Sequence, residues 1–194
     1  MKNKLIISSS ICLLSAVGLL SAVFDLSSNS QAKQPNQQAN IPALKEVIAQ
    51  ASTTLPVEQI LSQLKSKTQV PIFLPSQVAF SRKVYFSAQG KADGYTISID
   101  YTANCRGAGA CSAGEITAEK SGEFMEKIEG VTKTLKTIQL AKGTKGVFHN
   151  GCGAYCTASA QWKNQGVLYT VAIKNGREVE TVKIANSAIE SGQR

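Results

Sequence analysis

Four cysteines in two short loops are the residues best placed by type and spacing to do chemistry. They lie as Cys105-x5-Cys111 and Cys152-x3-Cys156, within the segments CRGAGAC and CGAYC. An even number of cysteines in an exported chain is typical of disulfides, and four cysteines permit three connectivities. Local pairing is favoured by proximity and by the small residues between the partners. Pairing between the two loops stays open, because a bridge that closes a longer loop stabilises by about 4 kcal/mol, against about 2 kcal/mol for each local bridge.

Three reactive roles compete with the disulfides. A thiol oxidoreductase uses Cys-x-x-Cys at the start of a helix, whereas the closer pair here has three intervening residues. A zinc site would need His149, Cys152, Cys156 and one cysteine of the other loop, without the usual Cys-x2-Cys spacing. A nucleophile at Cys152 activated by His149 is excluded if that cysteine is in a disulfide. We therefore expect no metal and no cofactor, and we expect His149 to be a surface or strand-end histidine beside a loop.

The remaining polar residues match no catalytic motif. The chain has no Gly-x-Ser-x-Gly, His-Glu-x-x-His, phosphate-loop or dinucleotide-binding sequence. Four carboxylates, Asp93, Asp100, Glu115 and Glu119, flank an expected hairpin, where the ordinary interpretation is the solvated face of a sheet. The sequence thus predicts a binding or structural module and no enzyme. A thiol-disulfide redox protein that uses the cysteine loops is the alternative.

If the cysteine loops do not pack against the core, they are also the expected sites of contact with a binding partner. Crosslinked loops rich in small residues can present backbone N–H groups and exposed side chains to a partner. Arg106 and Tyr155 are the binding residues that this hypothesis names. It requires both loops at the same end of the sheet, with both side chains exposed on one surface.

The N-terminal region predicts export. Lys2 and Lys4 precede the apolar stretch 5–24, and Ser30 and Ala32 supply the small residues of a cleavage site, so residues 1–32 are expected to be a signal peptide. The alternative is an uncleaved N-terminal helix that anchors the protein. Residues 33–53 are expected to form a flexible linker, because Gln, Asn, Ala and Pro dominate them. Residues 54–194 are expected to form one globular domain, in the periplasm or outside the cell.

The charge of the exported chain favours anionic partners. Removal of residues 1–32 takes away Lys2, Lys4 and Asp25, which leaves 19 basic and 12 acidic side chains, a net charge of +7. An anionic envelope polymer, a membrane surface or another envelope protein is consistent with this charge. Nucleic acid is disfavoured as a partner because the chain is expected to be exported.

Hydrophobic periodicity predicts an α+β fold, a mainly antiparallel sheet with an N-terminal and a C-terminal helix packed on it. Helices are expected after Pro56, from the stripe Val57, Ile60, Leu61 and Leu64, and over 177–190, from the stripe Val179, Val182, Ala185, Ala188 and Ile189. One or two further helical turns are expected between Gly122 and Gly130. Strands are expected at 84–88, 94–102, 114–119, 132–141, 146–149 and in a hairpin over 158–173, with an extended edge or entry segment at 70–75.

Several of these segments resemble a known but uncharacterised family. Gly146-Val147, Trp162, Tyr169-x-Val171 and Lys183-Ile184-Ala185-Asn186-Ser187 are similar to the C-terminal part of a bacterial domain found in lipoproteins and anti-sigma-factor-like envelope proteins. The segment 70–75 and the Cys105 to Cys111 loop resemble exported cyanobacterial proteins of unknown function. The resemblance implies an exported α+β module with no established activity, and the cysteines are not part of the broader domain's pattern.

Overall fold

The structure is a computed structural model that describes residues 51–194. The predicted signal peptide and residues 33–50 of the predicted linker lie outside the described residues. The elements in chain order are β1 (Ala51–Thr54), α1 (Val57–Leu64), β2 (Gln77–Phe80), β3 (Tyr85–Lys91), β4 (Gly94–Asp100), β5 (Ser112–Lys120), β6 (Thr132–Gln139), the 3-10 helix η1 (Ala141–Gly143), β7 (Lys145–Cys152), β8 (Cys156–Asn164), β9 (Val167–Lys174) and α2 (Glu178–Ser191).

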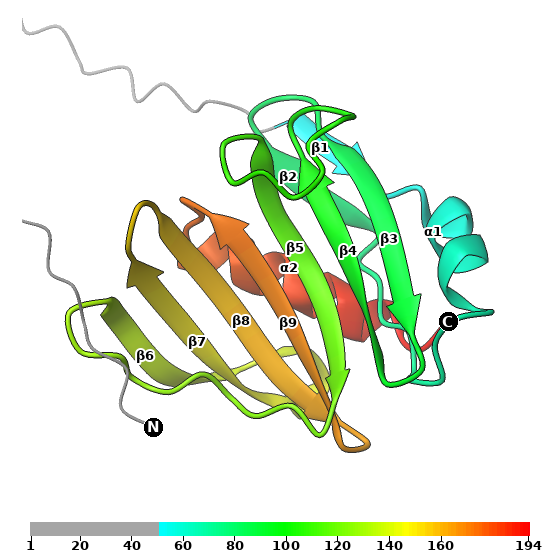
Figure 1. Cartoon of the computed structure of the whole chain (residues 1–194). Helices are drawn as coiled ribbons and strands as arrows, with labels where there is room; N and C mark the ends of the chain where they lie inside the picture. The colour runs from blue at the N-terminus through cyan, green and yellow to red at the C-terminus, as the bar shows by residue number, and fades with distance from the viewer. Residues whose placement is uncertain (1–50) are drawn as a thin grey trace, which may run out of the picture. The chain divides into compact units, whose positions relative to one another are not determined.

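A seven-stranded antiparallel sheet organises the domain (Figure 1). Its strand order is β3-β4-β5-β9-β8-β7-β6, and a separate two-stranded sheet pairs β1 with β2. Strands β3 to β5 are neighbours in the chain, as are β6 to β9. The ladder between β5 and β9 joins these two groups, with Gly114 opposite Ile173 and Lys120 opposite Val167.

One face of the large sheet forms the core. Alternate side chains such as Ile97 of β4, Ile116 of β5 and Val171 of β9 are almost fully buried there, as the period of two in a strand requires. Helix α2 packs against this face at β8 and β9, and α1 packs beside β3. Figure 1 shows α2 running behind the sheet. The α+β fold with an early and a C-terminal helix, predicted from the sequence, is confirmed.

The segment before β2 is held by two tyrosines from the sheet. The hydroxyl of Tyr95 donates to the carbonyl of Phe73 and accepts from its N–H, both at 3.1 Å, and Tyr169 donates to the carbonyl of Pro71 at 2.9 Å. The predicted extended segment 70–75 therefore runs across the core. It forms only an isolated bridge, between Phe73 and Gln193, and is not a sheet strand.

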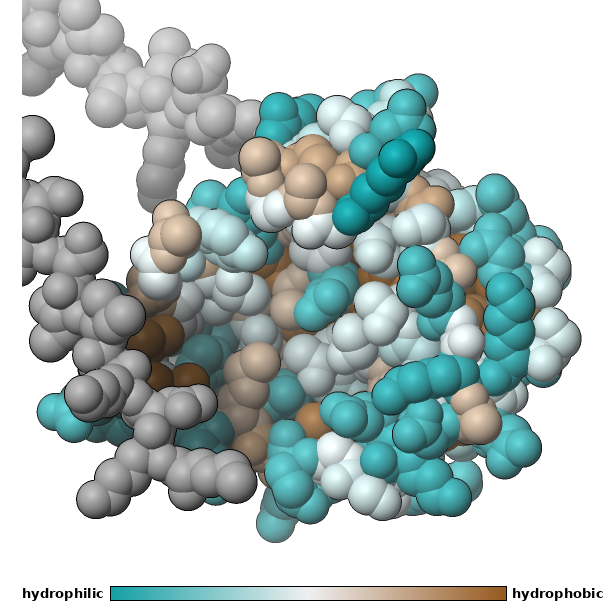
Figure 2. Space-filling model, viewed as in Figure 1, coloured by the Kyte–Doolittle hydropathy of each residue, from teal (hydrophilic) through white to brown (hydrophobic). Residues whose placement is uncertain are grey.

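The other face of the sheet is crossed by the segment 121–131, which links central β5 to edge strand β6 (Figure 1). No helix forms here, so the helical turns predicted between Gly122 and Gly130 are wrong. Backbone amides that a helix would pair internally are bound by side chains: Met125 N–H donates to Gln161 Oε1 at 2.8 Å, and Ile128 N–H to Thr132 Oγ1 at 2.9 Å. Outside this crossing, the visible face carries mainly hydrophilic and neutral residues (Figure 2).

The remaining elements differ from the sequence predictions in three ways. Strand β2 was not predicted, and β1 includes residues 51–53 of the predicted linker. The buried stripe of α2 is rotated from the predicted one, because Thr181 and Ile184 are buried whereas Val179 is 78% exposed.

None of the helices in residues 51–194 is long and apolar enough to cross a membrane.

Candidate functional site

Each cysteine loop closes on itself. Disulfides join Cys105 to Cys111 and Cys152 to Cys156, so the local connectivity holds. The first bridge closes the connection between β4 and β5, and the second closes the three-residue turn between β7 and β8. Disulfides persist in oxidising compartments and are rare in the cytoplasm, so the two bridges indicate a non-cytoplasmic location.

Both loops lie at the same end of the sheet (Figure 1). In the ladders of the central strands, Gly114 at the start of β5 pairs with Ile173 near the end of β9, and Lys174 pairs with Thr157 at the start of β8. The first loop ends where β5 begins, and the second ends where β8 begins. The register therefore places the loops on either side of the C-terminal end of β9.

A hollow of about 240 Å³ lies between the two loops on the face opposite α2. Its walls come from four strands and both loops, and the lining residues are Ser98, Asp100, Gly107, Gly109, Ser112, Gly114, Glu115, Tyr155, Thr157, Ala172 and Lys174. We call it the loop-end pocket. A bulge beside it shifts the register between Ile99 and Asp100, which face Gly114 and Ser112 across the ladder and leave Ala113 as the extra residue. Bulges of this kind often re-aim side chains next to binding sites.

Lys174 connects the two loops across the pocket. Its Nζ donates a hydrogen bond of 2.5 Å to the carbonyl oxygen of Gly109 in the first loop. The same ammonium group lies 4.4 Å from the centre of the Tyr155 ring in the second loop, within the range of a cation–π interaction. One side chain of the central sheet thus contacts both loops.

The pocket also contains a buried carboxyl group. Asp100 is only 8% exposed, and its Oδ1 is closed to solvent and has no hydrogen-bond partner in the part of the chain that the structure describes. Burial disfavours the charged form and raises the pKa of this carboxyl. Glu115, on the neighbouring strand, is exposed at the pocket wall. The sequence predicted ordinary solvated carboxylates at both positions, and for Asp100 that prediction is wrong.

The two residues expected to bind a partner occupy different positions at this end. Tyr155 lines the pocket and is 46% exposed. Arg106 is also exposed, but it does not line the pocket, although its neighbour Gly107 does. Arg106 has a φ of 49°, a left-handed conformation that a bulky residue rarely adopts. Two parts of the binding hypothesis are therefore present, both loops at one end of the sheet and both side chains exposed, whereas a single surface shared by Arg106 and Tyr155 stays a prediction.

His149 is not a surface residue. It is 8% exposed in β7, where its Nε2 is 3.2 Å from Thr132 Oγ1 and its ring packs against Gly151. Of the two predicted positions, surface or strand end, the surface position is wrong, because His149 is buried near the end of β7. Burial lowers the pKa of the imidazole. Among residues 51–194, no three His, Cys, Asp or Glu side chains are grouped as metal ligands.

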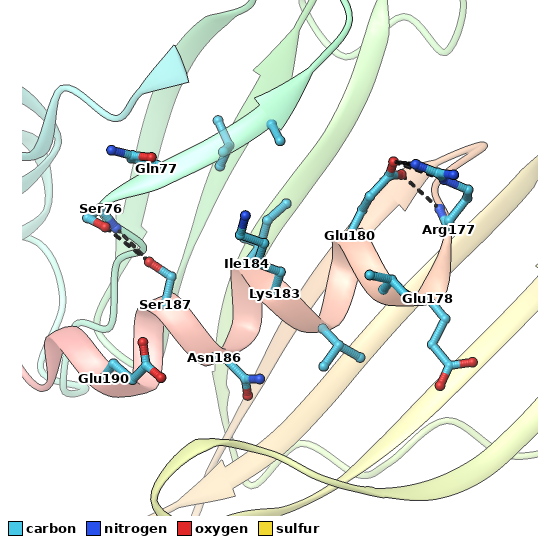
Figure 3. A pocket seen from close by; sticks show the side chains of 14 residues that line it. Ser76, Gln77, Arg177, Glu178, Glu180, Lys183, Ile184, Asn186, Ser187 and Glu190 are labelled. Carbon is cyan, nitrogen blue, oxygen red and sulfur yellow. Dashed lines mark hydrogen bonds and ion pairs between the residues drawn. The ribbon is translucent and has the colours of Figure 1, made fainter. Parts of the chain in front are cut away.

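A second and larger hollow, of about 910 Å³, runs along α2 beside β2 (Figure 3). Several of its polar side chains already have partners. Ser187 Oγ accepts from the N–H of Ser76 at 3.1 Å, and Arg177 forms an ion pair with Glu180 in a capping box at the start of α2. This groove is larger than the loop-end pocket, but none of its lining residues has a buried side-chain polar atom without a partner. The loop-end pocket is therefore the better candidate site.

Sequence reasoning found the loops and Tyr155 but missed Asp100, Glu115 and Lys174 as site residues. One weak signal existed, because Asp100 ends the alternating strand directly before the cysteine loop and Lys174 ends the last strand before Asn175-Gly176. Comparisons of the chain with protein-family models, with curated proteins and with solved structures found no match.

Proposed function

We propose that this protein is an exported, non-catalytic binding module of the bacterial envelope that recognises its partner at the loop-end pocket. The observation that carries the proposal is that Lys174 contacts both crosslinked loops and lines the same pocket as the buried Asp100 carboxyl. Binding loops held rigid before contact lose less conformational entropy when a partner binds. The resemblance to uncharacterised exported envelope domains supports the same compartment, periplasmic or secreted, or anchored if the N-terminal segment is retained.

A thiol-disulfide redox protein is the competing proposal, and the geometry of the cysteines supports it less. A redox-active cysteine is usually exposed at the N-terminus of a helix, which lowers the pKa of the thiol. Here Cys105 is buried, and Cys156 begins a strand. In residues 51–194 the helices begin at residues 57, 141 and 178, away from all four cysteines. Turnover in an insulin-reduction assay, lost when Cys152 and Cys156 are both replaced by Ser, would favour the redox protein.

Site-specific photocrosslinking in the producing cell tests the binding proposal. Benzophenone at position 155 reacts with nearby C–H bonds of protein, glycan or lipid, so the partner class need not be known. The matched control is position 179, because Val179 is also an exposed side chain but lies on α2. We expect adducts of higher mass from position 155 and none from position 179. Adducts from 179 alone, or from neither position, would overturn the proposal.

A further inference from the structure

We propose that the loop-end pocket binds one ring of a neutral saccharide. This inference rests on the proposed function and adds the chemical class of the ligand. The ring would lie against Tyr155, and its hydroxyl groups would bond to the carboxyl groups of Asp100 and Glu115 and to hydroxyls on the sheet. The pocket's charge, its free hydrogen-bonding groups and its size carry the argument.

The charges in the pocket disfavour an ionic ligand of either sign. An anionic group would lie beside the carboxyl groups of Asp100 and Glu115, both of which line the pocket. A cationic group would meet the ammonium of Lys174, which already occupies the favourable position over the ring of Tyr155. Like charges brought close together outside bulk water repel strongly. A neutral ligand avoids both repulsions.

The unpaired polar groups match a ligand with many hydroxyls. The hydroxyls of Ser98, Ser112 and Thr157 line the pocket, and in the described part of the chain none of them has a side-chain hydrogen bond. Asp100 lines the pocket, and because its Oδ1 is closed to solvent, a ligand hydroxyl would donate to the other carboxyl oxygen. Sugar hydroxyls both donate and accept, so one ring can bond to carboxyl and hydroxyl groups together.

An extended peptide fits this site less well. Peptides commonly bind sheets by adding a strand to a free edge. The pocket is instead built on β4, β5, β8 and β9, and each of these strands is paired on both sides in the seven-stranded order. Backbone groups at the floor of the pocket are therefore engaged in ladders, and recognition must use side chains.

The size of the pocket limits the ligand to a single unit. Pockets for drug-sized ligands measure roughly 300–1,000 Å³, and this one measures about 240 Å³. Tyr155 is 46% exposed at the wall, so the C–H face of a sugar ring can pack against the part of its ring that Lys174 does not cover. One ring of a longer glycan, with the rest of the chain in solvent, would satisfy this geometry.

Nuclear magnetic resonance titration of the ¹⁵N-labelled, oxidised exported protein tests the inference with matched sugars. N-acetylglucosamine is compared with glucosamine, and glucose with glucuronate, so that each pair differs by one charged group. We expect at least one neutral sugar to shift the backbone amide signals of Gly107, Gly109 and Lys174 in a saturable way. Its charged counterpart should bind at least fivefold more weakly.

Two variants and one control connect the binding to the pocket. Asp100→Asn and Tyr155→Ala should each weaken the neutral sugar at least tenfold while the rest of the spectrum stays folded. Asp93→Asn should bind as the wild type does, because the Asp93 side chain is 60% exposed and lies outside the pocket.

The result also separates this inference from the proposed function. If none of the sugars shifts these signals up to tens of millimolar, a range that covers weak single-site binding, the saccharide inference is overturned. The same holds if a charged member of a pair binds better. Crosslinks from position 155 would then still support a binding module, whereas loss of both signals would overturn both proposals.

Discussion

Replacing Asp100 by Asn should stabilise the protein at neutral pH. A buried acceptor without a partner costs about 1–3 kcal/mol, and more when it is charged. Asp100 is 8% exposed, and its Oδ1 has no partner among the described residues. Asparagine keeps the shape of the side chain and an acceptor oxygen, so the expected gain comes from removal of the buried charge. We therefore expect the free energy of unfolding at pH 7 to rise by about 1 kcal/mol. This value is at the lower end of the range because the pocket leaves part of the carboxyl group accessible to solvent.

The pH dependence of this gain follows from the direction of the pKa shift. Burial raises the pKa of the Asp100 carboxyl in the folded state above its value in the unfolded chain, which is about 3.9. As pH rises from the unfolded pKa through the folded pKa, the unfolded state loses its proton first, so the wild type loses stability over this window. Below the unfolded pKa both states hold the proton and the penalty is absent. The advantage of Asp100→Asn should therefore be small at low pH and grow as pH rises.

Urea unfolding with the disulfides intact measures this difference. Trp162 is the single tryptophan, it is buried, and it stacks on Tyr169 at 5.3 Å, so its fluorescence reports the loss of the core. The control is Asp93→Asn, which removes an exposed ion pair with Lys91 and should change stability by less than about 1 kcal/mol. A less stable Asp100→Asn at pH 7, or a stability gap that does not change with pH, would refute the reasoning.

Two further predictions concern other positions in the same sheet. Burial lowers the pKa of His149, so the wild type should lose stability as pH falls through the unfolded value of about 6.5, and His149→Gln should lose less in urea unfolding between pH 7 and pH 5. Gly94→Ala should cost roughly 1–3 kcal/mol by thermal or urea unfolding, because the new Cβ would collide with the carbonyl oxygen of Ala118. Gly153→Ala, where no atom lies within 4 Å of the added Cβ, should have little effect, and an equal loss in both variants would contradict the steric argument.

Patterns of neighbouring residues predicted most of the fold. The alternation of Tyr95, Ile97 and Ile99 predicted β4 with one wet face, and the spacing of residues 158–173 predicted the β8–β9 hairpin; both are confirmed. Strand β2 was missed because four residues are too few to reveal an alternation of apolar and polar side chains. One or two helical turns were predicted between Gly122 and Gly130 from apolar spacing, but the Met125 amide there bonds to the side chain of Gln161, which is distant in sequence.

The composition of the site was harder to predict because it depends on which strands become neighbours. The pairing of β5 with β9 brings together residues that are far apart in the chain, and no local pattern records it. The hydrogen bond from Lys174 to Gly109 and the contact of Lys174 with the Tyr155 ring form only when β5 and β9 are paired. Asp100 had the sequence pattern of a solvated carboxylate, and the folded loops around it changed its environment.

The β5–β9 ladder also has a consequence for how the chain reaches this structure. Contacts between residues that are distant in sequence slow folding, because the entropy of closing a long loop is lost before the contacts can stabilise the chain. Strands β3 to β5 form one run of hairpins and β6 to β9 another, and each disulfide lies within a single hairpin. We expect oxidation to proceed within each run before the two runs join, since neither bridge spans the β5–β9 ladder. The late, rate-limiting step should then be the docking of two hairpin units that are already covalently closed.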